Sequence, residues 1–297
     1  MVRRRTLLAA TLLAPLGSCK SLGVDAPGRS SAAATDDHVA AARFAELESR
    51  FGTRLGVYAV DSATGQELSH RADERFPMCS TFKVLAAAAV LDRNPTEHLD
   101  LRVRYRPTDV VPFSPITESH VDGGLTIREL CDAAIRYSDN TAGNLLLNDL
   151  GGPGEVTTFA RSLGDRMTRL DRREPELNSA VPGDDRDTTS PRAIAADYRE
   201  LVLGSRLDEA DRALITGWLV GNTTGGTRIR AGLPADWRVG DKTGAGRYGV
   251  VNDVAIAWPP DAAPIVLAVL SARLTPDAEG DNVLIAQAAT VIADELG

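Results

Sequence analysis

The chain has 297 residues, of which 43% are hydrophobic and 25% are charged. This balance is typical of a globular protein and excludes both an intrinsically disordered chain and one built mainly of membrane-spanning segments. The formal net charge is −8, and the basic residues are scattered rather than gathered into tracts. We therefore expect no nucleic-acid partner.

The N-terminal residues have the pattern of an export signal. The basic run Arg3-Arg4-Arg5 precedes an apolar stretch at residues 7–16 that is too short to span a bilayer. We predict a signal peptide over residues 1–18, and its arginine pair resembles a twin-arginine signal. Leu16-Gly17-Ser18-Cys19 resembles a bacterial lipobox, in which Cys19 becomes the lipidated first residue of the mature protein.

The segment after this signal is rich in Gly, Ser, Ala and Pro, and we expect residues 19–36 to form a flexible tether. The alternative is ordinary cleavage near Ala32-Ala33-Ala34, which would discard Cys19. The protein is therefore expected to be exported, and either anchored by lipid to the outer face of the cytoplasmic membrane or released. We expect a monomer.

Apolar periodicity and turn residues predict the elements of the remaining chain. Helical spacing begins the domain, a strand pair follows, and the middle region is helical, with Thr126 and Glu129 forming a capping box. Strands then return before a last helix. The predicted helices are 37–51, 80–92, 130–137, 141–150, 190–204 and 281–296, and the predicted strands are 54–60, 66–70, 237–243, 252–258 and 265–272.

This order of elements predicts an α/β (α+β) fold in which both chain ends contribute to one antiparallel sheet flanked by helices. An all-helical subdomain is inserted between them, with the active site in the cleft at the join. We expect one catalytic domain over residues 37–297. Its α/β part covers about 37–76 and 220–297, and its helical part about 77–219.

Metal chemistry is not expected. The histidines show no spacing typical of metal ligands, so a zinc hydrolase is excluded and we read them as surface or structural residues. They are His38, His70, His98 and His120.

Ser80 and Lys83 form an S-x-x-K motif where a helix begins, and a spacing of three places both side chains on one helix face. A serine becomes a good nucleophile when a neighbouring base accepts its proton, and a lysine can do so if burial lowers its pKa. Lysine is rare in this chain, with only three residues beside thirty arginines. Because arginine stays protonated, a lysine at this position points to proton transfer, although an ordinary surface S-x-x-K at a helix start accounts for this motif when it is taken alone.

Two further motifs are weak when taken singly. Ser138-Asp139-Asn140 lies between two helices, where it could simply cap the second one. Lys242-Thr243-Gly244 ends a strand and could be an ordinary turn junction. The three motifs in this order are, however, the set typical of class A β-lactamases and penicillin-binding proteins.

On these residues the chain resembles a class A β-lactamase from about residue 38 to its C-terminus. Ser138-Asp139-Asn140-Thr141-Ala142 and Gly221-Asn222-Thr223-Thr224-Gly225 extend the resemblance. The family fold agrees with the predicted two-part architecture. The resemblance implies small-molecule β-lactam substrates and no cofactor or metal.

The segment that begins at Arg172 resembles the family's Ω-loop, in which Arg172 and Asp187 would pair across the neck. Its prolines, glycine and lack of periodicity also predict a long functional loop. Within it, Glu174 and Asn178 have the spacing that ester hydrolysis needs. The carboxylate would take a proton from water, and the amide would position that water.

The resemblance also implies a role for each site residue. Ser80 would attack the lactam carbonyl, with the backbone amides of Ser80 and Ala245 as the oxyanion hole. Either Lys83 or Glu174 would accept the Ser80 proton, and the sequence leaves this open. Ser138 would pass a proton to the leaving nitrogen.

The remaining residues would bind the substrate. Lys242 and Thr243 would bind its carboxylate, and Asn140 together with the Ala245 backbone would contact its acylamide side chain. Phe113 replaces a tyrosine found in many members, so stacking is kept and a hydroxyl is lost. Arg228 stands at one of two places from which members direct an arginine at the substrate carboxylate, although a plain surface arginine fits the sequence nearly as well.

The two cysteines beyond the signal cannot form either family disulfide, because the partner positions are Ala87 for Cys131 and Gly246 for Cys79. We expect both thiols to be free. Two other functions share part of the pattern: a penicillin-sensitive D,D-peptidase, and a catalytically silent lipoprotein that binds cell-wall peptides. Glu174 and Asn178 argue against the first, and the intact Ser80 and Lys83 against the second.

Overall fold

The computed structural model describes residues 31–297, with side chains from residue 39 onward. The signal peptide, the lipobox at Cys19 and the tether up to residue 30 lie outside this range. Helix α1 spans Ser31–Phe51 and so begins before residue 37, where the sequence pattern placed its start. The tether prediction is therefore wrong for residues 31–36, because the alanine run at 32–34 has high helix propensity.

A five-stranded antiparallel sheet forms the middle layer, in the order β2-β1-β9-β8-β7. The first strand of the chain pairs along its whole length with the last, from Arg54 opposite Ala272 to Asp61 opposite Ile265. Both ends of the chain therefore build one sheet, as expected. The strands are β1 (Arg54–Asp61), β2 (Glu67–His70), β7 (Arg238–Gly246), β8 (Val250–Trp258) and β9 (Ile265–Ala272).

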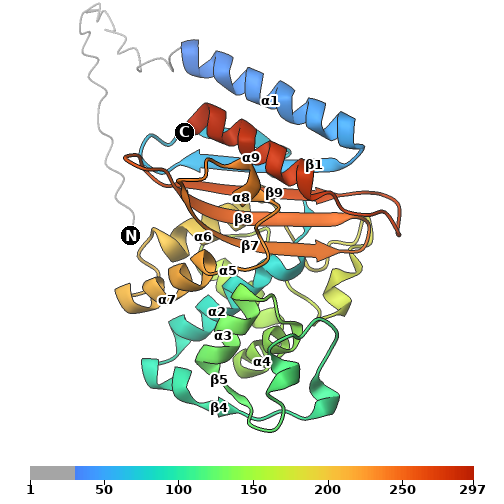
Figure 1. Cartoon of the computed structure of the whole chain (residues 1–297), viewed down its shortest axis with the longest axis vertical. Coiled ribbons are helices and arrows are strands. Elements are labelled where there is room, and N and C mark those ends of the chain that lie inside the picture. The colour runs from blue at the N-terminus through green and yellow to red at the C-terminus, as the bar shows by residue number, and fades with distance from the viewer. Residues whose placement is uncertain (1–30) are drawn as a thin grey trace, which may run out of the picture.

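Helices cover both faces of this sheet, which explains why its inner strands are runs of apolar residues rather than alternating patterns. In β9, Leu267 and Val269 pack with α1, α8 (Ile229–Gly232) and α9 (Asn282–Leu296). The intervening Val266 and Ala268 face the larger core beneath the sheet. Figure 1 shows α1 and α9 above the sheet and the remaining large helices below it.

The helical region is built around α2 (Phe82–Arg93), which is buried from Phe82 to Leu91. The other helices are α3 (Ile127–Arg136), α4 (Asn140–Leu150), α5 (Gly154–Ser162), α6 (Pro191–Val202) and α7 (Glu209–Val220). Sequence periodicity did not single out α5, α7 or α8. Short strand pairs, β3 (Phe76–Pro77) with β6 (Thr188–Thr189) and β4 (Arg102–Val103) with β5 (Leu125–Thr126), tie its loops together.

Helix α6, which lies within the predicted helical part at residues 77–219, also packs against β1, β8 and β9. Its buried Tyr198 donates a hydrogen bond to the carbonyl of Thr81 at 2.9 Å. α6 thus joins the sheet to the start of α2 and to the helical core. Among residues 31–297, no helix is long and apolar enough to cross a membrane.

Candidate active site

Ser80 lies in a 3₁₀ turn, Cys79–Thr81, that leads directly into α2. The turn is fixed from the sheet side, because the Asn252 amide on β8 donates to the carbonyls of Pro77 and Met78 at 2.8 and 3.2 Å. Cys79 adopts φ +47°, a conformation that side chains rarely take without tertiary support. The serine hydroxyl is therefore presented by a turn that the surrounding structure constrains.

Lys83 is completely buried and lies one helical turn after Ser80. Its Nζ donates to Ser80 Oγ at 3.0 Å, to the Ser138 carbonyl at 2.7 Å and to Asn140 Oδ1 at 2.7 Å, and it lies 3.1 Å from Glu174 Oε1. Burial lowers the pKa of Lys83, and the charge of Glu174 opposes that shift. The amine thus lies beside the Ser80 hydroxyl in an environment that favours loss of its proton.

Gly143 on α4 leaves the space that the Lys83 side chain occupies. A Cβ on Gly143 would lie 3.0 Å from Lys83 Cε, which is closer than side chains normally pack. Asp139 caps the same helix by accepting from the Ala142 amide at 2.8 Å. The cap suggested by the Ser138-Asp139-Asn140 motif is therefore present, and Ser138 and Asn140 on either side of Asp139 contact Lys83.

Glu174 is buried and contacts Ser80 from the Ω-loop. Its Oε1 accepts from Ser80 Oγ at 3.3 Å, and its Oε2 accepts from Asn178 Nδ2 at 2.5 Å. The Asn178 Oδ1 atom is buried and has no hydrogen-bond partner within the described chain. The E-x-x-x-N spacing thus places the carboxylate and the amide against one another, next to the serine.

The neck of the Ω-loop, residues 172–187, is closed as the resemblance implied. Arg172 Nε lies 2.5 Å from Asp187 Oδ2, and Asp187 Oδ1 accepts from the backbone amides of Asp171 and Arg172. A buried carboxylate that accepts from several donors fixes the chain that supplies them. The two ends of the loop are therefore joined directly.

Asn144 is a positioning residue that sequence reasoning missed. Its Oδ1 accepts from the Glu174 amide and its Nδ2 donates to the Glu174 carbonyl, each at 2.9 Å. The only signal was its position four residues after Asn140, on the same side of a helix. This pair of bonds fastens the Ω-loop to α4 at the residue that carries the carboxylate.

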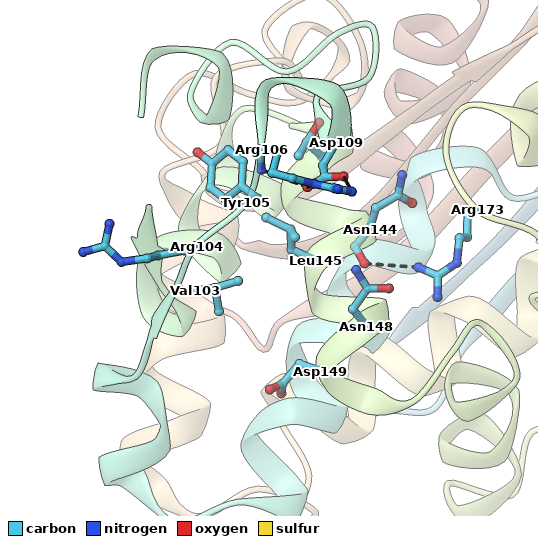
Figure 2. A pocket seen from close by; sticks show the side chains of 11 residues that line it. Val103, Arg104, Tyr105, Arg106, Asp109, Asn144, Leu145, Asn148, Asp149 and Arg173 are labelled. Atoms are coloured by element: carbon cyan, nitrogen blue, oxygen red, sulfur yellow. Dashed lines mark hydrogen bonds and ion pairs between the residues drawn. The ribbon is translucent and has the colours of Figure 1, made fainter. Parts of the chain in front are cut away.

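A cavity of about 720 Å³ lies on the other side of this connection (Figure 2). Its walls come from α4 and from the segment 103–109, with Asn144 and Arg173 at one side. Arg173 donates to the Asn144 carbonyl at 3.3 Å, as the dashed line in Figure 2 marks. None of the predicted catalytic residues lines this cavity.

Lys242 approaches the site from β7. Its Nζ donates to Ser138 Oγ and to the Thr243 carbonyl, each at 2.9 Å. Burial lowers the pKa of Lys242 well below its ordinary value, and the neighbouring charge of Lys83 adds to the effect. The Ser138 residue therefore lies between the two lysines, with its carbonyl on Lys83 and its hydroxyl on Lys242.

The Gly221–Gly225 motif holds β7 in place by side-chain hydrogen bonds to that strand. Asn222 Nδ2 and Arg230 Nε each donate to the Asp241 carboxylate at 2.5 Å. The Thr224 and Thr243 hydroxyls are 2.6 Å apart. The motif therefore fixes the position of β7 around Lys242.

Arg228 also helps to fix the position of β7. It donates to the carbonyls of Gly244 and Asn252 at 2.8 and 2.7 Å, and to Asn282 Oδ1 at 2.9 Å. Burial lowers the pKa of its guanidinium. The side chain thus binds the backbone of the K-T-G strand and is not a free surface arginine.

Of the remaining predicted residues, Phe113 and Ala245 are exposed and Asn140 is buried. Phe113 is 65% exposed, and its carbonyl accepts from the Asn140 amide at 3.0 Å. Both polar atoms of the Asn140 side chain have partners. Its Oδ1 accepts from Lys83, and its Nδ2 donates to the Pro112 carbonyl at 2.9 Å. Ala245 is exposed near the end of β7.

Cys79 and Cys131 are both buried and free, which confirms the prediction. Burial raises the pKa of both thiols. Where the structure gives side chains, no group of three or more His, Cys, Asp or Glu residues has the arrangement of a metal site.

The comparisons with known proteins agree with this geometry. A sequence model described as the beta-lactamase enzyme family matches residues 40–296. The β-lactamase AST-1 of Nocardia asteroides is 56% identical, covering 99% of this chain and 96% of that protein. The solved β-lactamase of Streptomyces albus G is 55% identical with a TM-score of 0.86, covering 87% of this chain and 100% of the other. That of Desulfarculus baarsii is 52% identical with a TM-score of 0.87, covering 88% and 98%.

The fold and the buried serine–lysine pair define a serine hydrolase of the acyl-enzyme type. The chain belongs to the β-lactamase enzyme family, as a class A serine β-lactamase. It hydrolyses the amide of β-lactam antibiotics and so confers resistance to them.

Proposed function

We propose that Ser80 is the nucleophile that opens the lactam and that Glu174 activates the water that later releases the product. The proposal rests on two contacts of the Ser80 hydroxyl. Its Oγ lies 3.0 Å from Lys83 Nζ and 3.3 Å from Glu174 Oε1. Two bases within hydrogen-bond reach of one hydroxyl suit a reaction with two proton-transfer steps.

In acylation, Ser80 Oγ bonds to the lactam carbonyl carbon while its proton moves to Lys83 or Glu174. The backbone amides of Ser80 and Ala245 stabilise the oxyanion. The C–N bond then breaks as Ser138 gives its hydroxyl proton to the nitrogen, and the proton first taken from Ser80 is passed on to Ser138. The lowered pKa of Lys83 supports this lysine as the acceptor, because a neutral amine can take the serine proton.

In deacylation, Glu174 takes a proton from water as that water attacks the ester, and Asn178 positions the same water. The unpartnered Asn178 Oδ1 supports this assignment, because a buried acceptor without a donor is normally satisfied by a bound molecule. The ester C–O bond then breaks, and the proton held by Glu174 returns to Ser80 Oγ.

Substrate binding is assigned to the opposite side of the site. Lys242 and Thr243 bind the substrate carboxylate, and the Lys242 charge favours the proton transfer from Ser138. Asn140 and the Ala245 backbone contact the acylamide group, and Phe113 stacks on the substrate. Arg228 supports the carboxylate subsite through the Gly244 carbonyl.

A chromogenic cephalosporin tests the whole assignment. The wild-type enzyme should turn it over many times, and Ser80→Ala should not. A penicillin-sensitive D,D-peptidase would react once and stop, and a silent lipoprotein would not react at all. Single-turnover behaviour of the wild type would therefore refute the assigned role of Glu174.

We also propose that the enzyme is exported and attached to the outer face of the cytoplasmic membrane by a lipid on Cys19. The support is the Leu16-Gly17-Ser18-Cys19 sequence beyond the basic and apolar signal. Cys19→Ala should release the protein from the membrane fraction. If the wild-type protein appears in the medium with a mature terminus near Thr35, the lipobox assignment is wrong.

We propose further that the enzyme acts as a monomer, since one chain contains every assigned site residue. Light scattering on the purified enzyme should give the mass of a single chain. A stable dimer would contradict this.

A further inference from the structure

The two backbone amides of the proposed oxyanion hole come from separate segments of the chain. Ser80 belongs to the 3₁₀ turn Cys79–Thr81, and Ala245 lies near the end of β7. Such donors stabilise the oxyanion only when both lie within about 2.7–3.1 Å of the oxygen on which charge develops. The reaction therefore depends on the groups that hold this turn and this strand at a fixed separation.

Asn252 on β8 lies between the turn and β7. It is completely buried, and it stands directly opposite Gly244 in the antiparallel pair of β7 and β8. Residues that oppose each other in such a pair project from the same face of the sheet. The Asn252 side chain therefore lies on the face at which Gly244, the residue before Ala245, meets the catalytic turn.

The side-chain amide of Asn252 holds the residues that lead into the turn. Its Nδ2 donates to the carbonyls of Pro77 and Met78 at 2.8 and 3.2 Å, and its Oδ1 accepts from the Ser271 amide on β9 at 3.2 Å. Both polar atoms of the side chain thus have partners, and this fixes its orientation. The turn is thereby fastened to an inner strand of the sheet.

The same point of the sheet is tied to β7. Arg228 Nη1 donates to both carbonyls of the opposed pair, to Gly244 at 2.8 Å and to Asn252 at 2.7 Å. A Cβ on Gly244 would lie 2.9 Å from the Met78 carbonyl oxygen and 3.3 Å from Cys79 Cβ. The turn and β7 are therefore in close contact beside the two amides of the oxyanion hole.

The other anchors of the turn lead to different parts of the fold. The Met78 amide donates to the Asp187 carbonyl at the neck of the Ω-loop, at 3.0 Å. The Thr81 carbonyl accepts from Tyr198 on α6 at 2.9 Å. These bonds do not involve Asn252, so they should keep the turn folded when its amide is removed, while the position of the turn relative to β7 is released.

We propose that Asn252 is a positioning residue that fixes the separation of the two oxyanion-hole amides. It acts through the backbone of the turn and of β7, and it touches no reacting atom. The inference rests on the proposed function, because the oxyanion hole of Ser80 and Ala245 is assigned there. Removal of one oxyanion donor costs about 10²–10³-fold in kcat, so displacement of one should cost about tenfold or more.

Calorimetry with phenylboronic acid tests this role. The boron bonds to Ser80 Oγ as the serine proton passes to a base, and a boron hydroxyl then takes the place of the oxyanion. Asn252→Ala should weaken this binding about tenfold or more and lower kcat/KM for benzylpenicillin to a similar extent. Benzylpenicillin binding to Ser80→Ala protein, in which no ester forms, should be nearly unchanged when Asn252→Ala is added.

Ser271→Ala is the matched control. It removes a buried hydrogen bond from Ser271 Oγ to the Val251 carbonyl at 2.6 Å, on the same strands, but it leaves the Asn252 amide on the turn. It should keep the wild-type affinity for phenylboronic acid. Asn252→Asp retains the shape of the side chain without its donor, and it replaces Asn252→Ala if circular dichroism shows that the alanine variant is unfolded.

Wild-type affinity for phenylboronic acid in a folded Asn252→Ala or Asn252→Asp protein would overturn the proposal. An equal loss in Ser271→Ala, or an equal loss of benzylpenicillin binding in the Ser80→Ala background, would also overturn it, since either would indicate a general loosening of the site. Phenylboronic acid binding to Ser80→Ala with undiminished affinity would instead refute the proposed nucleophile, so the two failures are distinguishable.

Discussion

Replacing Glu174 by alanine should separate the two half-reactions of this enzyme. The substitution removes the carboxylate from Ser80 Oγ and Asn178 Nδ2, but it leaves Lys83 with acceptors on Ser80, Ser138 and Asn140. Lys83 therefore remains in place. Because the Glu174 charge raises the pKa of Lys83, its removal favours the neutral amine still further. Acylation through Lys83 should accordingly continue.

Deacylation should slow strongly. A positioned general base contributes about 10²–10⁴-fold, which corresponds to roughly 3–5 kcal/mol of activation free energy. Glu174→Ala enzyme mixed with benzylpenicillin should therefore gain one substrate mass, confined to the peptide that contains Ser80. Ser80→Ala should gain none. Glu176→Ala, an exposed glutamate on the same loop, is the matched control and should turn over normally.

Two other outcomes are informative. Hydrolysis by Glu174→Ala at the wild-type rate would refute the assignment of this residue as the deacylating base. A folded Glu174→Ala protein that never forms the adduct would instead identify Glu174 as the acylation base. Circular dichroism on the same sample establishes whether the protein is folded.

Lys242→Ala should reduce turnover by several orders of magnitude while Lys242→Arg keeps more activity, because the assigned role is positive charge; Lys83→Arg should be nearly inactive, because arginine cannot accept a proton. Similar steady-state rates for the two arginine variants would contradict these separate roles. Asp197 is buried with one oxygen unpartnered, and burial, followed by the Asp165 charge, raises its pKa well above the ordinary value. The folded state then holds a proton that the unfolded state releases above about pH 4, so stability falls with rising pH by up to about 1.4 kcal/mol per unit until the folded pKa is passed. Urea unfolding should show Asp197→Asn gaining stability over wild type as pH rises, and parallel pH profiles would refute this. Thiol titration of the denatured, unreduced mature domain should find both of its cysteines, and a result of none would indicate a disulfide.

The motifs in the sequence were informative because part of the chemistry is local. Ser80 and Lys83 are brought together by one helical turn, and Glu174 and Asn178 by one turn of the Ω-loop. The spacing of such pairs can be read directly from the chain. The capping box at Thr126 and Glu129 was also found for this reason.

Periodicity was less informative about where elements end and what they cover. The predicted helix at residue 37 begins at Ser31, and α6 packs against the sheet as well as against α2 and α7. An amphipathic pattern shows that one face is buried but not which element covers it. Asn144 gave almost no signal, because its two hydrogen bonds are to the backbone of a distant loop.

The sequence by itself therefore determined the order of elements, the serine–lysine and glutamate–asparagine pairs and the family to which they point. Only the tertiary structure decided that Ser138 bridges Lys83 and Lys242, from three separate segments. It also decided that both lysines are completely buried, which lowers the pKa of each. The physical reason is that local spacing fixes contacts within one turn, whereas burial and contacts between remote segments depend on how the layers pack.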